Sequence, residues 1–559
     1  MNKFLQVLLF FLMVSISELA LASSGAYLAG RQAILDHNFV TASKFQTQSV
    51  SADPANSKLL EGLMISFVAQ GSVDEAISIA EVYKANGNVS QISQMILLTA
   101  MIKDGQTEAF LDFVKNASET TPILKDLLSA WIFMGLDDEV NANRMFDKTA
   151  KVQGMAQFAN FHRAMSQLAA GKFDQAQKTF DLIHNGQVNP TRRSVIYHTK
   201  LLLSQSKFKE AQQLLDKWIG PTFDPEIEEL YVNAADKKVY PESSFPKINI
   251  AVADVFHSIA NLISKEADPA FTLIYSRLAQ YLDHKHVDSI LMTADLLVEL
   301  GQYDLAIKQH ERISKSEPQF FASELGRAEA LRSSDKEMAA IEVLVELTRQ
   351  YPNSANGFSI LGNHYRRLEA YDKAEVSYGE AIKLYETKGE AGWFLYYVRG
   401  ITRERLDTWD LAEKDFRKAL SLNPNQPQVL NYLGYSLIEK NSNLDEALDM
   451  IERAVKESPD SGYIVDSLGW GYYKLGLYEK AVPNLERAAE LMPVDPIVND
   501  HLGDVYWMVG RKTEAEFQWR RALSFDPEAD EIERIKKKLK VGLTQVLMEE
   551  SEGTGSLVK

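Results

Sequence analysis

The sequence predicts an all-α protein, a right-handed superhelical solenoid of about fourteen helix-turn-helix units. Two observations support this prediction. The chain has 559 residues and is 45% hydrophobic, with only 29 glycines and 17 prolines, which is the composition of an ordered protein with a large core. Small, aromatic and proline residues also recur at a step close to 34 residues, and such a period is typical of stacked helix pairs.

The repeat is clearest in the unit that begins at Gly462, and the next unit begins 34 residues later, at Pro496. Small residues let two antiparallel helices approach closely, bulky residues fill the space between them, and a proline ends the second helix. One such unit cannot bury its own apolar face, so the units must stack. The residues that carry the pattern in the first of these units are Leu468, Gly469, Tyr472, Gly476, Tyr478, Ala481, Leu485, Ala488 and Pro493. This pattern resembles the tetratricopeptide repeat, most specifically over the five consecutive units from Ala355 to Pro527.

The predicted domain organisation follows the repeat. A proline-rich stretch interrupts the array, and a pair of degenerate helices is the alternative for it. The expected segments are a signal peptide (1–22), a degenerate N-terminal array (23–218), an irregular connection (219–250), a regular C-terminal array (251–530), a capping helix (531–548) and a flexible tail (549–559). The capping helix places Ile535 and Leu539 on an apolar side, and Arg534 and Lys538 on a polar side.

The first 22 residues have the features of an export signal. Lys3 precedes an apolar run from Phe4 to Ile16, and Ala20 and Ala22 are small residues where a signal peptidase reads the chain. The run is shorter than the roughly 20 residues that span a bilayer. We therefore expect cleavage after Ala22 and a periplasmic protein, with an uncleaved membrane anchor as the alternative.

Charge and cysteine content exclude several classes of function. The formal net charge of −17 opposes binding to nucleic acids and gives little attraction to anionic membrane surfaces. The chain has no cysteine, so it has no disulfide, thiol nucleophile, thiolate metal site or lipid-bearing cysteine. No motif of a zinc protease, a phosphate-binding loop or a nucleophile elbow occurs, and we expect neither catalysis nor a cofactor. The neighbours His284 and His286 could bind a metal, but an ordinary helix end is the preferred interpretation.

The resemblance also implies where a partner would bind. In tetratricopeptide proteins the first helix of each unit lines an inner, concave surface. The residues at the corresponding positions here are Asn363, Arg366, Arg367, Phe394, Tyr397, Arg405, Asn431, Tyr435, Tyr463, Asp466, Trp470, Tyr473 and Trp507. An aromatic groove of mixed charge suits polypeptide binding, because aromatic side chains give a large contact area at low entropic cost. Alternatively these aromatics pack between units, Trp470 and Tyr473 above all.

The resemblance implies a non-catalytic scaffold or adaptor that binds other proteins or peptides in this groove. The segment from Leu444 to Trp470 is similar to exported tetratricopeptide proteins of Gram-negative bacteria, which implies a role in envelope biogenesis or as an adaptor to a periplasmic protease. An accessory factor to a cell-wall or polysaccharide enzyme, and a self-assembling structural protein, are the alternative functions. The sequence does not name the partner.

Overall fold

A computed structural model describes residues 24–184, 190–218, 224–387, 389 and 392–555. In these residues the secondary structure consists of α-helices and one short 3-10 helix, without strands, which confirms the predicted all-α class. The predicted signal peptide, residues 1–22, lies outside the described residues. Each helix that is described is too short or too polar to cross a membrane.

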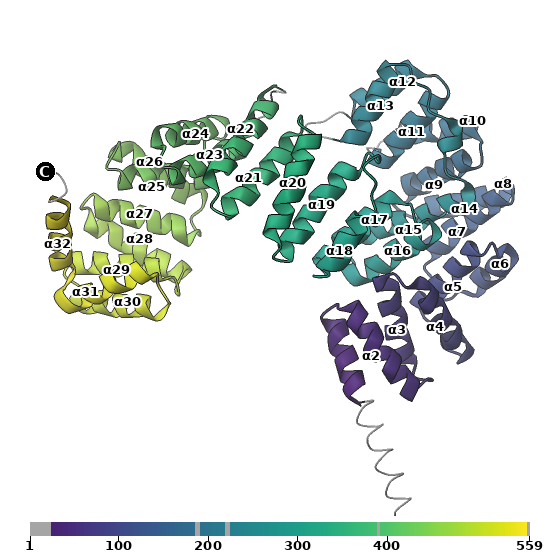
Figure 1. The fold of residues 1–559 in the computed structure, drawn as a ribbon, viewed down its shortest axis with the longest axis horizontal. Coiled ribbons are helices and arrows are strands. Elements are labelled where there is room, and N and C mark those ends of the chain that lie inside the picture. The colour runs from purple at the N-terminus through teal and green to yellow at the C-terminus, as the bar shows by residue number, and fades with distance from the viewer. Residues whose placement is uncertain (1–23, 185–189, 219–223, 388, 390–391, 556–559) are drawn as a thin grey trace, which may run out of the picture. The chain divides into compact units, whose positions relative to one another are not determined.

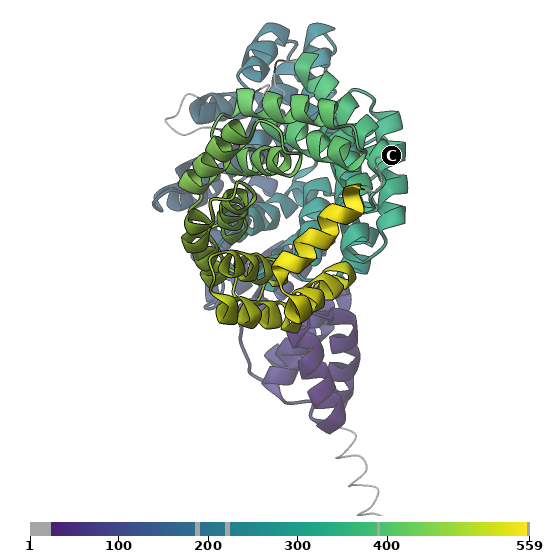
Figure 2. The same ribbon diagram turned by 90° about the vertical axis from the view of Figure 1, so that its left-hand side faces the viewer.

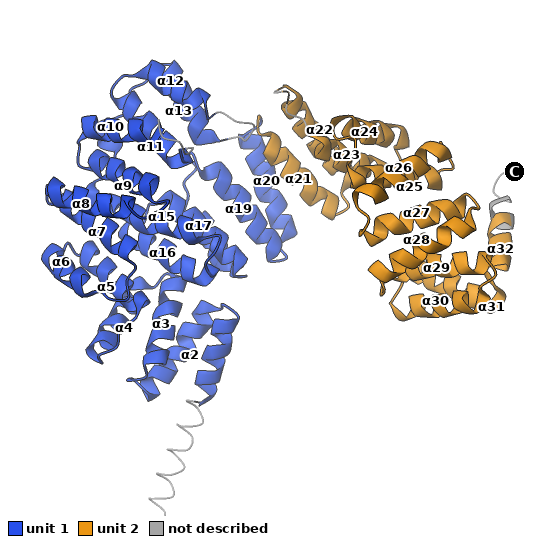
Figure 3. Cartoon of the chain, turned by 180° about the vertical axis from the view of Figure 1, so that it is seen from behind, with its two compact units in different colours: residues 1–352 blue, residues 353–559 orange. Residues whose placement is uncertain are grey.

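The chain divides into two compact units, residues 1–352 and residues 353–559 (Figure 3). After a first helix over residues 24–35, the helices of unit 1 are α2 (Phe39–Ala52), α3 (Ser57–Gln70), α4 (Val73–Ala85), α5 (Gln91–Lys103), α6 (Thr107–Asn116), α7 (Pro122–Gly135), α8 (Glu139–Ala150), α9 (Ala156–Ala169), α10 (Phe173–His184), α11 (Arg192–Ser204), α12 (Phe208–Asp216), α13 (Pro225–Ala235), η1 (Glu242–Ser244), α14 (Ile248–Ala251), α15 (Ala253–Ile263), α16 (Pro269–Leu282), α17 (Val287–Glu299), α18 (Tyr303–His310), α19 (Phe320–Ser333) and α20 (Glu337–Gln350).

The helices of unit 2 are α21 (Ala355–Arg367), α22 (Tyr371–Thr387), α23 (Trp393–Arg405), α24 (Trp409–Leu422), α25 (Pro427–Glu439), α26 (Leu444–Glu457), α27 (Gly462–Lys474), α28 (Tyr478–Leu491), α29 (Pro496–Met508), α30 (Lys512–Ser524), α31 (Ala529–Val541) and α32 (Leu543–Gly555). The helices from α21 to α30 form five antiparallel pairs, as the repeat predicts. Successive first helices, such as α25, α27 and α29, contact one another directly and so line the inner side of the curved array (Figure 2).

Unit 1 is not a simple row of pairs, because its later helices fold back onto its earlier ones. Helices α14 to α16 pack on α3, α5, α7 and α9 (Figure 1), and one hydrophobic core joins these helices. Arg277 of α16 donates from Nε to the Ala69 carbonyl at 3.0 Å, and Lys103 donates from Nζ to the Tyr281 carbonyl at 2.7 Å. The unit boundary therefore lies at Pro352 and not within residues 219–250, where the sequence placed the break.

The segment 219–250 also differs from its prediction, because residues 225–235 form helix α13. Pro225 occupies the first turn of this helix, where its missing N–H is not needed, and so starts a helix instead of breaking one. The Asp224 carboxylate accepts a hydrogen bond from the Ile227 backbone N–H at 3.3 Å and caps the helix. Helix α13 packs on α11 and α12 through a shared apolar core, which includes Ile227 and Leu230.

The C-terminal end corrects two further predictions. The single capping helix predicted over 531–548 is two helices, α31 and α32, which meet at Gly542. Gly542 has a φ of +81°, a conformation that favours glycine and ends α31. The tail predicted to be flexible from residue 549 is helical to Gly555, and residues 556–559 lie outside the described part of the chain.

Glycines on the first helices set the distance between the paired helices of unit 2. A Cβ added to Gly400 would lie 2.7 Å from the Phe416 ring, and one added to Gly434 would lie 2.7 Å from the Ala447 carbonyl oxygen. Real Cβ atoms do not approach that closely, so these positions hold no larger residue without moving the second helix. The small residue of the repeat therefore determines how closely the two helices of a pair can pack.

The change Gly434→Ala should destabilise unit 2 by about 1–3 kcal/mol, since its Cβ would meet backbone that cannot yield. The matched control is Gly379→Ala on α22, where the nearest atom would be 3.9 Å away. This second change should stabilise the helix by up to about 1 kcal/mol, because alanine is the better helix former. Urea unfolding of the full chain, followed by circular dichroism, measures both effects. Equal effects of the two changes would contradict the packing argument.

Candidate protein-binding surface

The sequence-predicted residues lie on the first helices of unit 2, and the structure separates them into an exposed group and a packed group. Phe394 and Tyr463 are 47% and 48% exposed, and Arg367 and Arg405 are exposed as well. We use the name open groove for the group on α21, α23 and the start of α27 that comprises Arg366, Arg367, Phe394, Tyr397, Arg405 and Tyr463. Of the remaining residues, Asn431, Asp466, Trp470 and Tyr473 are buried, while Asn363, Tyr435 and Trp507 are half-buried.

Tyr397 is the central side chain of the open groove. Burial raises the pKa of its phenol, Tyr463 adds to that rise and Arg366 opposes it. Tyr463 of α27 and Arg366 of α21 therefore both lie near enough to Tyr397 of α23 to influence its ionisation. The Tyr397 ring meets Tyr432 edge to face, with 6.0 Å between the ring centroids, and this contact fixes its orientation.

The charged residues of the open groove are partly held by their own helix pairs. Arg366 donates from Nε to the Tyr378 hydroxyl at 3.3 Å, and that hydroxyl donates to Asn363 Oδ1 at 2.8 Å. The Arg405 guanidinium lies 3.8 Å from Glu404 and its side chain is 60% exposed. Asn363 therefore helps to hold Arg366 in place through the Tyr378 hydroxyl, within the helix pair α21 and α22. Arg405, in contrast, is available to a negatively charged partner.

The packed group forms a stack across α27 and α29. The Trp470 indole lies between Tyr473 and His501, with centroid distances of 4.6 and 3.9 Å. Its Nε1 donates to Glu439 Oε1 at 2.9 Å. Trp470 and Tyr473 are thus part of the core, as the alternative interpretation of the sequence held for these two residues. They are positioned by neighbouring units and offer little surface to a partner.

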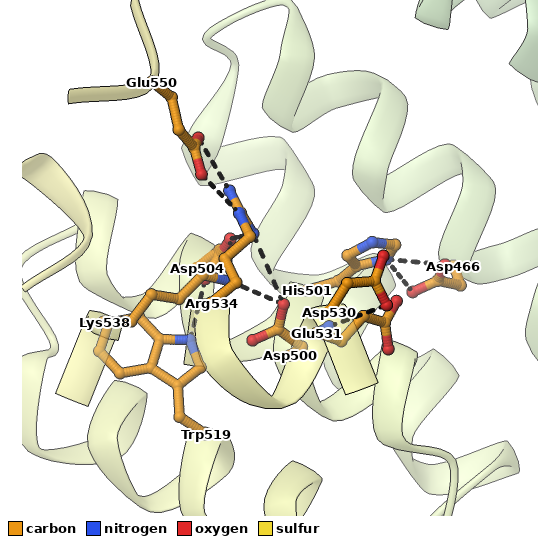
Figure 4. Close-up of polar contacts among 10 residues, drawn as sticks. All are labelled: Asp466, Asp500, His501, Asp504, Trp519, Asp530, Glu531, Arg534, Lys538 and Glu550. Atoms are coloured by element: carbon orange, nitrogen blue, oxygen red, sulfur yellow. Dashed lines mark hydrogen bonds and ion pairs between the residues drawn. The ribbon is translucent and has the colours of Figure 1, made fainter. Parts of the chain in front are cut away.

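A buried ion cluster follows this stack (Figure 4). The Lys538 side chain of α31 is 0% exposed, and its Nζ lies 2.7 Å from both Asp500 and Asp504 on α29. Trp519 Nε1 also donates to Asp504 at 2.8 Å. Arg534 adds weaker ion pairs to the same two carboxylates, at 3.8 and 3.6 Å. The positive charges of α31 thus neutralise the acidic inner positions of the last repeat.

This cluster corrects the prediction that Lys538 lies on a solvated polar face. The reason is that α31 continues the repeat frame: Lys538 and Asp504 are 34 residues apart, which is one repeat. The same step relates Arg534 to Asp500. If the 34-residue repeat is continued past Pro527, Lys538 and Arg534 fall at the positions that Asp504 and Asp500 occupy one repeat earlier. The sequence therefore contained the information that these cations face the aspartates.

His501 is the titratable group of the stack. Its Nδ1 lies 3.0 Å from Asp466 Oδ2. Burial alone lowers the pKa of an imidazole, but the Asp466 carboxylate, with Asp500 and Asp504 nearby, outweighs burial and raises the pKa of His501. The protonated ring then lies against the Trp470 face, where a cation is favoured.

The histidine pair that the sequence offered as an alternative metal site is in unit 1. His286 Nε2 lies 2.8 Å from Asp254, and its Nδ1 lies 3.1 Å from the Ser289 backbone nitrogen. The described residues contain no group of three or more histidine or carboxylate side chains arranged to bind a metal ion. His286 instead joins an internal network with Arg193, whose guanidinium also pairs with Asp254.

Comparison with known proteins identifies the family of this array. A family model described as the tetratricopeptide repeat matches residues 291–355, 397–462 and 467–530. These three segments of the chain are tetratricopeptide repeats. The all-α helix-pair architecture agrees with this family in both the period and the position of the small residues. Tetratricopeptide arrays are generally non-catalytic and bind other proteins or peptides.

Similar proteins share only part of their length with this chain. A TPR repeat-containing protein of Pseudomonas aeruginosa is 28% identical over 215 residues, which are 38% of this chain and 30% of that protein. A lipoprotein NlpI homolog of Haemophilus influenzae is 38% identical over 90 residues, 16% of this chain and 27% of that protein. Among solved structures, the Cut9 and Hcn1 hetero-tetramer of the APC/C aligns with a TM-score of 0.37 and 14% identity, covering 93% of this chain and 96% of that chain.

The change Asp466→Asn should destabilise unit 2 more at pH 6 than at pH 9. Because the folded-state pKa of His501 is raised, its contribution to stability is present below the unfolded-state pKa and is lost as the pH rises through the folded-state pKa. We expect a loss of about 1–3 kcal/mol at pH 6. Urea unfolding at the two pH values measures it, with Asp460→Asn, an 83% exposed carboxylate, as the control. Equal losses at both pH values would contradict this assignment.

Proposed function

We propose that unit 2 binds a partner polypeptide along the open groove and that the protein works as a non-catalytic scaffold or adaptor in the periplasm. The observation that carries this proposal is the exposure of Phe394 and Tyr463, each close to half exposed on a first helix of unit 2. Large aromatic side chains that are fixed in place but open to solvent are typical of protein-binding surfaces. The arginines beside them add directional donors for backbone or carboxylate groups of a partner.

The contacts within the open groove favour binding of a partner polypeptide over catalysis. Tyr397 is pre-oriented by Tyr432, so a partner that packs on it loses little additional side-chain entropy. Arg366 is likewise held by the Tyr378 hydroxyl. The charged groups nearby are bound in pairs such as Arg399 with Asp415, at 2.8 Å, which stabilises the repeat. These features favour a preformed surface that binds a polypeptide and does not catalyse a reaction on it.

The periplasmic location rests on the export signal predicted in residues 1–22. The similarity to a Haemophilus protein named as a lipoprotein supports a role at the bacterial envelope. In this proposal the partner is an envelope protein, such as a protease or a cell-wall enzyme that the scaffold holds.

The double change Phe394→Ala with Tyr463→Ala should weaken partner binding by at least about ten-fold, because both aromatic contacts are lost. The matched control is Phe517→Ala, a residue that is 60% exposed on the second helix α30 and so lies away from the inner face. Quantitative co-purification from the periplasm, followed by mass spectrometry, measures the partner recovered by each variant.

Recovery of a protein by the wild type and the control, but not by the double variant, supports the proposal. Equal recovery by all three, or recovery of no protein by the wild type under native conditions, would contradict it. Circular dichroism of each variant checks that the fold is unchanged.

The mature protein should begin at Ser23. Mass spectrometry of the intact protein from a periplasmic fraction measures its N-terminus. A chain that retains residues 1–22 in the membrane fraction would show that the signal is an uncleaved anchor and would overturn the proposed location.

A further inference from the structure

The last helix of the chain turns back onto the inner face of its own array. Gly542 separates α31 from α32, and a Cβ at this position would lie 2.4 Å from the Trp507 ring. Trp507 donates from Nε1 to Thr544 Oγ1 at 3.0 Å. Trp507 belongs to the first helix α29, so α32 covers the inner side of the last repeat, inside the curve of unit 2 (Figure 2).

The two C-terminal helices are held in different ways. Helix α31 is fixed by Lys538, which is enclosed between Asp500 and Asp504, and releasing it would leave buried carboxylates without a counter-ion. Among residues 543–551, for which α32 has its burial described, none is a buried charge. The ion pairs of α32 are Arg534 with Glu550 at 2.9 Å (Figure 4) and Lys537 with Glu549 at 2.5 Å, and they join side chains that are 34–45% exposed. Such pairs contribute little in water.

The contact surface of α32 has a defined chemistry. Leu543 and Val546, three residues apart on one helical face, are 0% and 1% exposed. Leu547 packs on the core that contains Tyr473 and Trp519. The carboxylates of the following turn pair with the cations of α31. The inner face of the last repeat thus accepts an amphipathic helix with an apolar first turn and an acidic second turn.

We propose that α32 is a built-in occupant of this inner face and that a partner's amphipathic helix of the same chemistry, with apolar residues three apart followed by adjacent carboxylates, displaces it. This inference rests on the proposed function and names the kind of partner segment. Charge complementarity supports it, because Arg534 and Lys537 remain in place on α31 after α32 leaves. Helix α29, which α32 covers, also contacts α27, the helix that carries Tyr463 of the open groove.

The test uses the full-length chain and a fluorescent synthetic peptide of residues 543–559 as the probe. Val546→Asp releases α32 by placing a charge in its buried apolar contact, and Glu549→Lys with Glu550→Lys weakens its docking independently by turning both attractions into repulsions. The matched control is Glu479→Lys with Glu516→Lys, which makes the same charge change at exposed positions of α28 and α30.

Both released variants should bind the peptide at least about ten-fold more tightly than the wild type and the control. Hydrogen exchange should become faster in α32 of these variants while exchange in α29 and α30 is unchanged. The proposal would be overturned if the wild type and the released variants bound the peptide equally tightly. It would also be overturned if neither released variant bound the peptide. Faster exchange in α29 and α30 together with α32 would show that α32 is part of the fold and would also overturn it.

This outcome is independent of the proposed function. The peptide assay involves no natural partner, whereas the comparison of the Phe394 and Tyr463 variants with the wild type leaves α32 unchanged in every protein. If the proposal holds, the released variants should also recover more of the natural partner than the wild type does.

Discussion

The close approach of two helices at a glycine is the contact on which unit 2 depends. At Gly400 and Gly434 the absence of a side chain lets the facing helix come near enough for Phe416 and Ile451 to fill the space between the helices. Each pair then presents two apolar faces to its neighbours, and stacking buries them. The inner face is the side on which first helices such as α25, α27 and α29 touch one another.

The fold of unit 2 could be predicted from the sequence because its determinants are local and recur. Gly469 faces Leu485, and Gly503 faces Trp519, each within a single repeat. Unit 1 could be predicted only in part. Its contacts join α16 to α3 and α5, and no repeat signal within either segment encodes that pairing. Pro225 is a different case, because Asp224 and Pro225 together are a local signal for the start of a helix, which was visible in the sequence and was missed.

The binding surface was predictable in position more than in exposure. The repeat frame assigns Phe394, Tyr397 and Tyr463 to first helices of their units, and they lie on α23 and α27, because that assignment depends only on the period of the repeat. The repeat frame does not predict the exposure of each side chain, because exposure depends on which positions are covered by residues of neighbouring repeats. Trp470 is covered because His501, one repeat away, stacks on it, and Trp507 is partly covered because α32 turns at Gly542. Both coverings depend on residues outside the repeat to which the tryptophan belongs. Whether the exposed set binds a partner stays a prediction.

The folding back of unit 1 has a consequence for the order in which the chain can fold. The hydrogen bond from Arg277 to Ala69 spans 208 residues, so a large loop must close before the inner helices find their place. Such contacts slow folding, whereas the contacts of unit 2 lie within one or two repeats and close quickly. During synthesis part of the apolar surface of α3 and α5 therefore stays exposed until α16, which ends at Leu282, has been made. The first half of the protein can complete its core only after α16 is present, while the second half can assemble one repeat at a time.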